Sequence, residues 1–166
     1  MSARQPASAL AWPVRQAGPG DADAIQALMV AATIHSIWPT LEAHARDPML
    51  ASYARTGLRQ RLGDGQHHFW LALDAEGGDP CGVIALQGAR KLQYLFVRPR
   101  WQRHGIGQTL WQVARAQGLQ MQADPDPFTV NASLNAVAAY ERLGFMVDGP
   151  VRDESGWRWQ PMCTRV

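Results

Sequence analysis

Residues 91–118 read KLQYLFVRPRWQRHGIGQTLWQVARAQG, and they carry the strongest structural signals in the chain. Bulky apolar residues at positions 92–97 predict a β-strand. Pro99 ends that strand, because proline has no N–H group to offer to a sheet. Apolar residues then recur with helical spacing over positions 106–114, which predicts an amphipathic helix with one buried face. We therefore expect a strand, a turn and a helix in direct succession.

The turn between this strand and this helix has the features of a phosphate site. Gly105 and Gly107 open the helix, where backbone N–H groups lack carbonyl partners and lie at the positive end of the helix dipole. Anions bind readily at such a position. Four side chains that can carry positive charge lie in the same turn: Arg98, Arg100, Arg103 and His104. The turn is therefore expected to bind a phosphate-bearing ligand.

Residues 97–107 also resemble a known motif. Val97-Arg98-Pro99 closes the predicted strand, and residues 102–107 read Gln-Arg-His-Gly-Ile-Gly. This order resembles the acyl-CoA-binding motif of the GCN5-related N-acetyltransferases (GNAT). In that motif Gln or Arg, two free positions, Gly, one free position and Gly or Ala follow a strand that ends in Val-x-Pro. The strand, the proline and the helix are all present, as the mechanism of the motif requires. An ordinary basic turn is the alternative.

Two other phosphate motifs fit the turn less well. A P-loop requires Gly-Lys followed by Ser or Thr, whereas Gly107 is followed by Gln108 and Thr109. A dinucleotide fingerprint requires a third small residue where this chain has Leu110. Neither motif is predicted.

A second stretch, VNASLNAVAAYERLGF at residues 130–145, resembles the same family. Its members commonly carry Asn, then a short helix with Tyr, then Leu-Gly-Phe. Two motifs in the expected order support the resemblance more strongly than either motif alone. The resemblance extends, more thinly, over residues 14–163.

The resemblance implies an α+β fold of the GNAT-like acyl-CoA N-acyltransferase type. Its core is a central, mixed but mostly antiparallel twisted sheet of about six to seven strands, flanked by about four helices. The predicted strand at residues 128–132 is expected to lie parallel to the strand at 91–97, because the helix between them forms a crossover. We expect residues 13–166 to form a single GNAT-like acetyltransferase domain, and residues 1–12 to form a flexible N-terminal arm.

Two further elements are predicted from local signals alone. Asp47 followed by Pro48 is typical of a helix start, and the helix is expected to continue to Leu62. Residues 146–151 and 156–163 are expected to form a final pair of strands around a short polar turn.

The resemblance also implies roles for individual residues. The main chain at the end of the strand would bind pantetheine, the glycine turn would bind pyrophosphate, and two asparagines would anchor the amide groups of the cofactor. Tyr140 falls at the position of the general acid that serves the departing thiolate, and a core tyrosine is the alternative. The predicted cofactor-binding residues are Leu95, Phe96, Val97, Gln102, Arg103, His104, Gly105, Ile106, Gly107, Gln108, Asn131 and Asn135.

The sequence departs from the family at one catalytic position. Family members that use a side-chain base often carry Glu on the strand before the glycine turn, where this chain has Gln93. The proton of the amine would then leave through water or through a side chain that the sequence does not single out. The open alternatives are His35, Glu42, His67 and His68.

The acceptor pocket is predicted only by its place in the chain. In the family, the connection between the first two helices shapes this pocket, which here falls at residues 33–48. Trp38 would form a wall, and His35, Glu42 or His44 would contact an amine. The alternative is that Trp38 packs on the core while these polar residues face water.

Composition limits the classes of partner. A formal net charge of +2 is too small to predict binding to nucleic acid or a membrane surface. No apolar run approaches the roughly 20 residues that span a bilayer, and the N-terminus lacks an apolar signal region. Cys81 and Cys163 lack metal-ligand spacing and are expected to be reduced, buried residues. We therefore expect a cytoplasmic protein without a metal.

The implied activity is acetyl transfer from acetyl-CoA, as cosubstrate, to a small-molecule or peptide amine. Homodimer formation would follow if the late strands pair between subunits, as in many family members. A binding module that keeps the acyl-CoA pocket without catalysis is the second hypothesis, because Gln93 replaces the common Glu. A nucleic-acid-binding protein that uses Arg98, Arg100, Arg103 and Trp101 is the third hypothesis.

Overall fold

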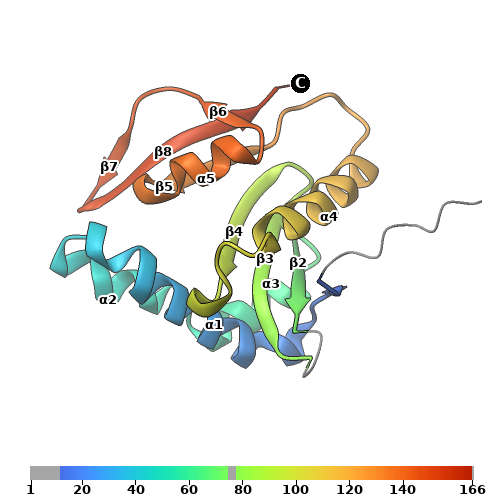
Figure 1. The fold of residues 1–166 in the computed structure, drawn as a ribbon, viewed down its shortest axis with the longest axis horizontal. Helices are drawn as coiled ribbons and strands as arrows, with labels where there is room; N and C mark the ends of the chain where they lie inside the picture. The colour runs from blue at the N-terminus through green and yellow to red at the C-terminus, as the bar shows by residue number, and fades with distance from the viewer. Residues whose placement is uncertain (1–11, 75–77, 166) are drawn as a thin grey trace, which may run out of the picture.

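The computed structural model describes residues 12–74 and 78–165, and its centre is a single sheet of eight strands (Figure 1). The strand order is β1-β2-β3-β4-β5-β8-β6, and β7 also pairs with β8. Neighbouring strands run antiparallel except for β4 and β5, which are parallel. The strands are β1 (Val14–Gln16), β2 (His67–Leu73), β3 (Pro80–Gln87), β4 (Lys91–Val97), β5 (Thr129–Ser133), β6 (Phe145–Val147), β7 (Arg152–Glu154) and β8 (Trp157–Thr164).

Helices cover both faces of the strands β2 to β4 (Figure 1). Helices α1, α2 and α3 contribute buried residues to one core, and α4 contributes to a second core on the opposite face. Helix α5 packs with the second core, beside β6. The helices are α1 (Ala22–Ser36), α2 (Ala43–Ala51), α3 (Arg55–Gly63), α4 (Ile106–Met121) and α5 (Val137–Arg142).

Strand β2 shows how the sequence builds the two cores. Its side chains alternate: Phe69 and Leu71 pack with the α1–α3 core, whereas Trp70 and Ala72 pack with the α4 core. Because successive side chains of a strand point to opposite faces, a continuous apolar run is what a sheet covered on both faces requires. Helix α4 packs against one of these faces through one buried stripe that includes Ile106, Leu110 and Ala114. Each such large side chain contributes about 1.5–3 kcal/mol when it is buried.

The predicted fold class is confirmed. The described residues form an α+β structure with a mixed, mostly antiparallel sheet, which has eight strands and five α-helices instead of about six to seven strands and about four helices. The predicted strands at residues 91–97 and 128–132 are parallel neighbours, as expected. The expected flexible arm falls on residues 1–11, which lie outside the described residues, and on Trp12.

The predicted helix from Asp47 to Leu62 is wrong in its start and in its continuity, because α2 ends at Ala51 and α3 begins at Arg55. Helix α2 begins earlier, with Glu42 at the N-cap position, and Pro48 lies inside it. A proline inside a helix removes one backbone hydrogen bond. Helix α2 tolerates this loss because Ala45 and Met49, one turn apart, are both buried against the core. Tertiary packing therefore overrides the local signal.

The predicted strand at residues 146–151 is also wrong in extent. Two short strands, β6 and β7, take its place, and both pair with β8. Gly149 has a φ of +97°, which bends the chain between them. Pro150 follows and has no N–H group for a ladder. The Gly-Pro pair therefore divides the strand.

The remaining expectations concern the cysteines and membrane helices. Cys81 is buried and Cys163 is half-buried, and both are free thiols. Within the described ranges, no helix is both long enough and apolar enough to cross a bilayer.

Candidate active site

The N-terminus of α4 is open for an anion. Gly105 has a φ of +81° and precedes the helix at its N-cap position. Throughout the described structure, the backbone N–H groups of residues 103–108 donate no hydrogen bond, and the first helical bond joins Thr109 N to Gly105 O at 3.0 Å. A Cβ atom built on Gly105 or Gly107 would meet no atom within 4 Å. Packing therefore does not require these glycines, and they leave free space in front of unpaired donors.

The sheet opens beside this turn. Strands β4 and β5 pair only at Lys91 with Thr129 and at Leu92 with Val130. The register between β3 and β4 shifts at the same place, so that Gln93 is an extra residue in a β-bulge. A bulge bends its strand and increases the local twist. The edge of β4 beyond Leu92 consequently has no neighbouring strand on its β5 side among the described strands.

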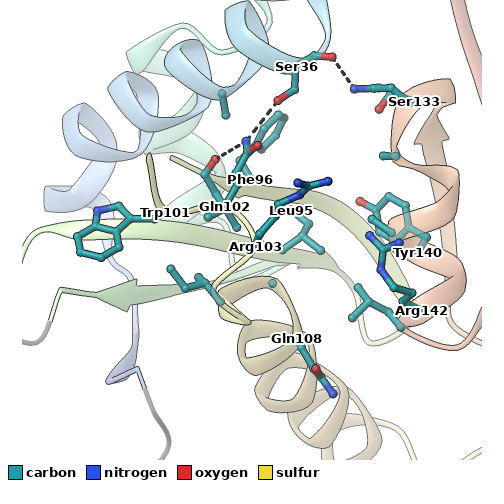
Figure 2. A pocket seen from close by; sticks show the side chains of 18 of the residues that line it. Ser36, Leu95, Phe96, Trp101, Gln102, Arg103, Gln108, Ser133, Tyr140 and Arg142 are labelled. Atoms are coloured by element: carbon teal, nitrogen blue, oxygen red, sulfur yellow. Dashed lines mark hydrogen bonds between the residues drawn. The ribbon is translucent and has the colours of Figure 1, made fainter. Parts of the chain in front are cut away.

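A cavity of about 470 Å³ lies between this opening and the α4 N-terminus, and we name it the cofactor cavity (Figure 2). The end of α1, the end of β4, the glycine turn and α5 form its walls. Figure 2 shows Arg103 and Arg142 reaching into it from two sides. Two guanidinium groups and free N–H groups make this cavity suited to a ligand with negative charge.

The structure brings most of the predicted site residues together. Eleven of them line the cofactor cavity, and they are Leu95, Phe96, Val97, Gln102, Arg103, Gly105, Ile106, Gly107, Gln108, Asn135 and Tyr140. His104 and Asn131 do not line it. The Nδ1 atom of His104 lies 2.8 Å from the carbonyl oxygen of Gln102, and its ring packs against Trp12 and Trp101. Asn131 lines a different cavity.

Two predicted cofactor ligands make contacts within the protein. Gln102 Nε2 donates to Val97 O at 3.2 Å and to Ser36 Oγ at 3.3 Å (Figure 2). Asn135 Nδ2 donates to the carbonyl oxygen of Ser36. Both side chains therefore join the end of α1 to the walls of the cavity. Their amide N–H groups have partners other than a phosphate, which favours a positioning role.

Tyr140 contributes a hydroxyl group to the cofactor cavity. Its ring packs edge-on against Phe145, with 5.6 Å between the ring centroids, and only 8% of the residue is exposed. The hydroxyl group forms no hydrogen bond with any described residue. Burial raises the pKa of the Tyr140 phenol well above its ordinary value. The phenol therefore keeps its proton at neutral pH and points a free O–H group into the site (Figure 2).

A second cavity, of about 490 Å³, adjoins the first, and we name it the acceptor cavity. Helix α2, the bulged part of β4, β7 and β8 contribute most of its lining. The two cavities share six residues, which are Ile37, Leu95, Phe96, Ser133, Ala136 and Tyr140. Tyr140 and Ser133 are the two polar residues of this shared set, so two ligands bound side by side would meet beside their hydroxyl groups.

None of the four base candidates predicted from the sequence lines either cavity. Glu42 pairs with His44 at 3.4 Å, and His67 pairs with Asp64 at 2.7 Å. His68 packs near the Trp70 ring, and His35 is exposed at the end of α1. Gln93, in contrast, lines the acceptor cavity, and its Oε1 atom is buried without a hydrogen-bond partner in the described structure.

Trp38 does not form the predicted wall of the acceptor cavity. The alternative, in which it packs on the core, describes its position. Trp38 packs against the α1–α3 core, the Arg46 guanidinium lies 5.6 Å from its ring centroid, and it lines neither cavity. His44 also lies away from both cavities, and its Nε2 atom lies 2.9 Å from Ser155 O.

The basic residues of the turn divide between different tasks. Arg103 faces the cofactor cavity, whereas Arg98 donates to Pro80 O at 2.8 Å. Arg100 stacks on Trp101, 5.0 Å from the ring centroid. They therefore do not form one continuous basic surface, which the nucleic-acid hypothesis requires.

Sequence reasoning missed several residues that line the cofactor cavity, notably Ser36 and Arg142. Helical spacing in the sequence could have predicted three further lining residues. Ala136, Ala139 and Leu143 lie within one turn of Tyr140, so they share a helical face with it. For Ser36 no local signal exists, because only the tertiary fold brings the end of α1 to this cavity.

Comparison with known proteins gives one family. A family model described as an acetyltransferase (GNAT) domain matches residues 41–166. No curated relative matches the sequence.

Three solved structures illustrate the shared fold. A GCN5-related N-acetyltransferase from Rhodopseudomonas palustris, described as "Aminotransferase, Class-II", is 19% identical with a TM-score of 0.80, over 93% of this chain and 96% of that chain. The PaiA N-acetyltransferase from Thermoplasma acidophilum, solved in complex with coenzyme A, is 15% identical with a TM-score of 0.77, over 95% and 100%. A mutant spermidine N-acetyltransferase from Vibrio cholerae is 18% identical with a TM-score of 0.63, over 92% of each chain.

Proposed function

Because this chain belongs to the GNAT acetyltransferase family, we propose that it transfers an acetyl group from acetyl-CoA to an amine by direct attack in a ternary complex. The observation that carries the proposal is the junction of two cavities at one free, protonated tyrosine hydroxyl. Acetyl-CoA would supply an activated thioester. The structure of a similar fold with coenzyme A bound supports an acyl-CoA cosubstrate.

The cofactor cavity fits an acyl-CoA in three respects. The N–H groups of residues 106–108 and the guanidinium of Arg103 would bind the pyrophosphate. The unpaired edge of β4, from Leu95 to Val97, would bond to the extended pantetheine as a sheet edge bonds to an added strand. Arg142 would contact a phosphate at the other wall of the cavity. Gln102 and Asn135 would hold these walls in place.

The chemistry at the junction would use few groups. A bond forms between the amine nitrogen and the acetyl carbon, the carbon–sulfur bond breaks, and the amine proton passes to water. A backbone N–H near Val97 would stabilise the negative charge that develops on the thioester oxygen. The Tyr140 hydroxyl would donate a hydrogen bond to the sulfur as it becomes a thiolate.

An amine must also lose a proton before it attacks, since its pKa is about 10. The described lining of the acceptor cavity contains one carboxylate, Glu154, at its exposed edge. Water in the cavity would therefore carry the proton outward, without a side-chain base in contact with the amine.

Replacement of Tyr140 by Phe tests the proposal. We expect the turnover number for acetyl-CoA with an amine acceptor to fall about 100-fold, in the range of general acid–base effects. The dissociation constant for coenzyme A, measured by calorimetry, should stay the same because the ring is retained.

A control is Tyr94→Phe, which removes a hydroxyl from the acceptor cavity alone. Full turnover in Tyr140→Phe would contradict the assigned donor. Tight binding of acetyl-CoA by the wild type, with no thioester consumption for any amine, would instead support the binding-module hypothesis.

A further inference from the structure

Two tryptophans define the outer wall of the acceptor cavity. Trp157 and Trp159 lie two positions apart on β8, so their side chains point to the same side of the strand. Both line the acceptor cavity. Trp157 is 39% exposed, which is unusual for the largest apolar side chain, and Trp159 is half-buried.

These two indoles lack the partners that the other tryptophans have. Within the described structure, neither has a neighbouring aromatic ring, a cation over its ring or a hydrogen bond from Nε1. Trp111, in contrast, packs against Phe128 and Phe145 and donates to Leu143 O at 3.1 Å. The Trp159 Nε1 atom is also not among the buried side-chain nitrogens that lack a hydrogen-bond partner, so it is open to the cavity. Two flat apolar surfaces with free N–H donors therefore face the cavity.

The rest of the lining is also aromatic. Tyr53, Tyr94 and Phe96 line the cavity and form one cluster, in which Tyr53 lies 6.3 Å from Tyr94 and 5.8 Å from Phe96 between ring centroids. Aromatic rings favour offset or edge-on packing at such separations. A flat ring that enters the cavity would find several partners of this kind.

Few charges face the same space. Among the described lining residues, Glu154 is the one acid and Lys91 is the one base. An acceptor with several ammonium groups would leave all but one without a carboxylate and would meet Lys91 as a like charge. Removing such unpaired charges from water is unfavourable. The lining therefore favours an acceptor with a single amine.

The register of the strands gives the direction of the cavity. Trp159 pairs with Ser133, which belongs to both cavities, whereas Trp157 pairs with Glu154. Two residues along a strand span about 7 Å. An amine at the junction would thus place its body beside Trp159 and its far end near Trp157.

We propose that the acceptor, in the acetyl transfer on which this inference rests, is a primary amine that carries a flat aromatic group on a short linker. The aromatic group packs against Trp159 and Trp157, and the amine lies at the junction with the cofactor cavity. Glu154 attracts the protonated amine to the entrance.

Steady-state rates at saturating acetyl-CoA test the acceptor class. Three probes suffice: 2-phenylethylamine, spermidine and a short lysine peptide. We expect kcat/KM for 2-phenylethylamine to exceed that of each of the others at least tenfold. A value for spermidine or for the peptide that equals or exceeds it would overturn the inference and leave acetyl transfer intact.

Variants on β8 test the tryptophans. Trp159→Ala should lower kcat/KM for 2-phenylethylamine at least tenfold, mainly through KM, and Trp159→Phe should restore most of it. Arg158→Ala, on the opposite side of the same strand, is the matched control and should change nothing. Unchanged coenzyme A binding in all variants shows that they fold. A wild-type KM in Trp159→Ala would contradict the proposal.

A binding measurement separates the acceptor class from catalysis. Titration of 2-phenylethylamine into the protein–coenzyme A complex should shift the indole N–H resonances of Trp157 and Trp159 in NMR spectra, and should leave Trp111 unchanged. Shifts without turnover would contradict acetyl transfer but uphold the aromatic amine site. Turnover of other amines without these shifts would contradict the site but uphold acetyl transfer.

Discussion

The two cavities are similar in volume but are built in different ways. The cofactor cavity rests on main chain: the N-terminus of α4, the glycine turn and the unpaired edge of β4, which are consecutive in sequence. The acceptor cavity consists of side chains from segments that are far apart, such as Met49 on α2, Gln93 on β4 and Trp159 on β8. A contiguous motif can therefore specify the glycine turn and the β4 edge of the first cavity, whereas its α1 and α5 walls and the whole second cavity depend on the complete fold.

Because of this difference, the two cavities should respond to different kinds of substitution. A substitution does not remove a main-chain N–H donor. The cofactor cavity is therefore sensitive mainly to new side chains that fill the space in front of these donors. The acceptor cavity is sensitive to the identity of each side chain that lines it. Substitutions in the two regions should therefore change different measured quantities.

The largest expected effect is on the main-chain site. Gly105→Glu would place a carboxylate in the free space before the α4 N-terminus, at a φ of +81° that favours glycine. We expect affinity for coenzyme A, measured by calorimetry, to fall at least 100-fold, which is about 2.7 kcal/mol.

Gly65→Glu is the matched control for this variant. Gly65 has a φ of +71° and also has no atom within 4 Å of a built Cβ, but it lies outside both cavities. It should lose similar stability and keep its affinity for coenzyme A. Equal loss of affinity in both variants would mean that strain, and not the anion site, explains the result.

A smaller effect is expected from a side chain of the acceptor cavity. Gln93→Glu places a carboxyl group where Oε1 is buried without a partner, and burial raises the pKa of such a group toward neutral pH. The carboxylate would then accept the amine proton. We expect kcat/KM for the amine to rise about tenfold at pH 7 with unchanged affinity for coenzyme A.

Gln93→Leu, which fills similar space without a base, should show no gain in rate. An equal rise in kcat/KM for both variants would contradict the role of the carboxylate as a base. Weaker coenzyme A binding in Gln93→Glu would show that the acceptor cavity and the cofactor cavity are energetically coupled.

The smallest expected effect concerns stability at high pH. Burial raises the pKa of Tyr53, in the acceptor cavity, to about 12. Between its ordinary pKa of about 10 and that value, the unfolded chain loses the proton while the folded chain keeps it. The free energy of unfolding therefore falls with rising pH in this window, by up to about 1.4 kcal/mol per pH unit for this group.

Tyr53→Phe should make this decline shallower. Urea unfolding at pH 9, 10 and 11, followed by tryptophan fluorescence, measures it. An unchanged slope in Tyr53→Phe would show that other groups, such as the buried phenol of Tyr140, dominate the alkaline loss.

The contrast between the cavities also explains what the sequence could predict. Positions 92–114 specify their structure locally, because the apolar runs, Pro99 and Gly105 each act on their immediate neighbours. The same is true of Gly144, whose φ of +95° ends α5 before Phe145. The fold class and the place of the cofactor cavity follow from such local signals together with the family resemblance.

The rest depends on contacts between distant segments. The bulge at Gln93 arises from the pairing of β3 with β4, and it is visible only in the register. Helix α2 begins before Asp47 because Ala45 and Met49 bury against the core. The same holds for the base candidates: polar residue type marks a possible role, but tertiary position decides whether His35 or Glu42 reaches a cavity, and neither lines one.

The limited pairing of β4 with β5 has a consequence for the dynamics of the chain. Within the one sheet, only two residue pairs, Lys91 with Thr129 and Leu92 with Val130, join the described strands β1–β4 to β5–β8, although contacts such as Asn135 with Ser36 also link the two parts (Figure 1). Proteins open in cooperative units that often coincide with such substructures. Amide protons of β5 and β8 should therefore exchange with solvent through a separate, lower-energy opening than those of β2 and β3. A ligand that contacts both β4 and α5 would couple the two groups of strands, so that they open together as one cooperative unit.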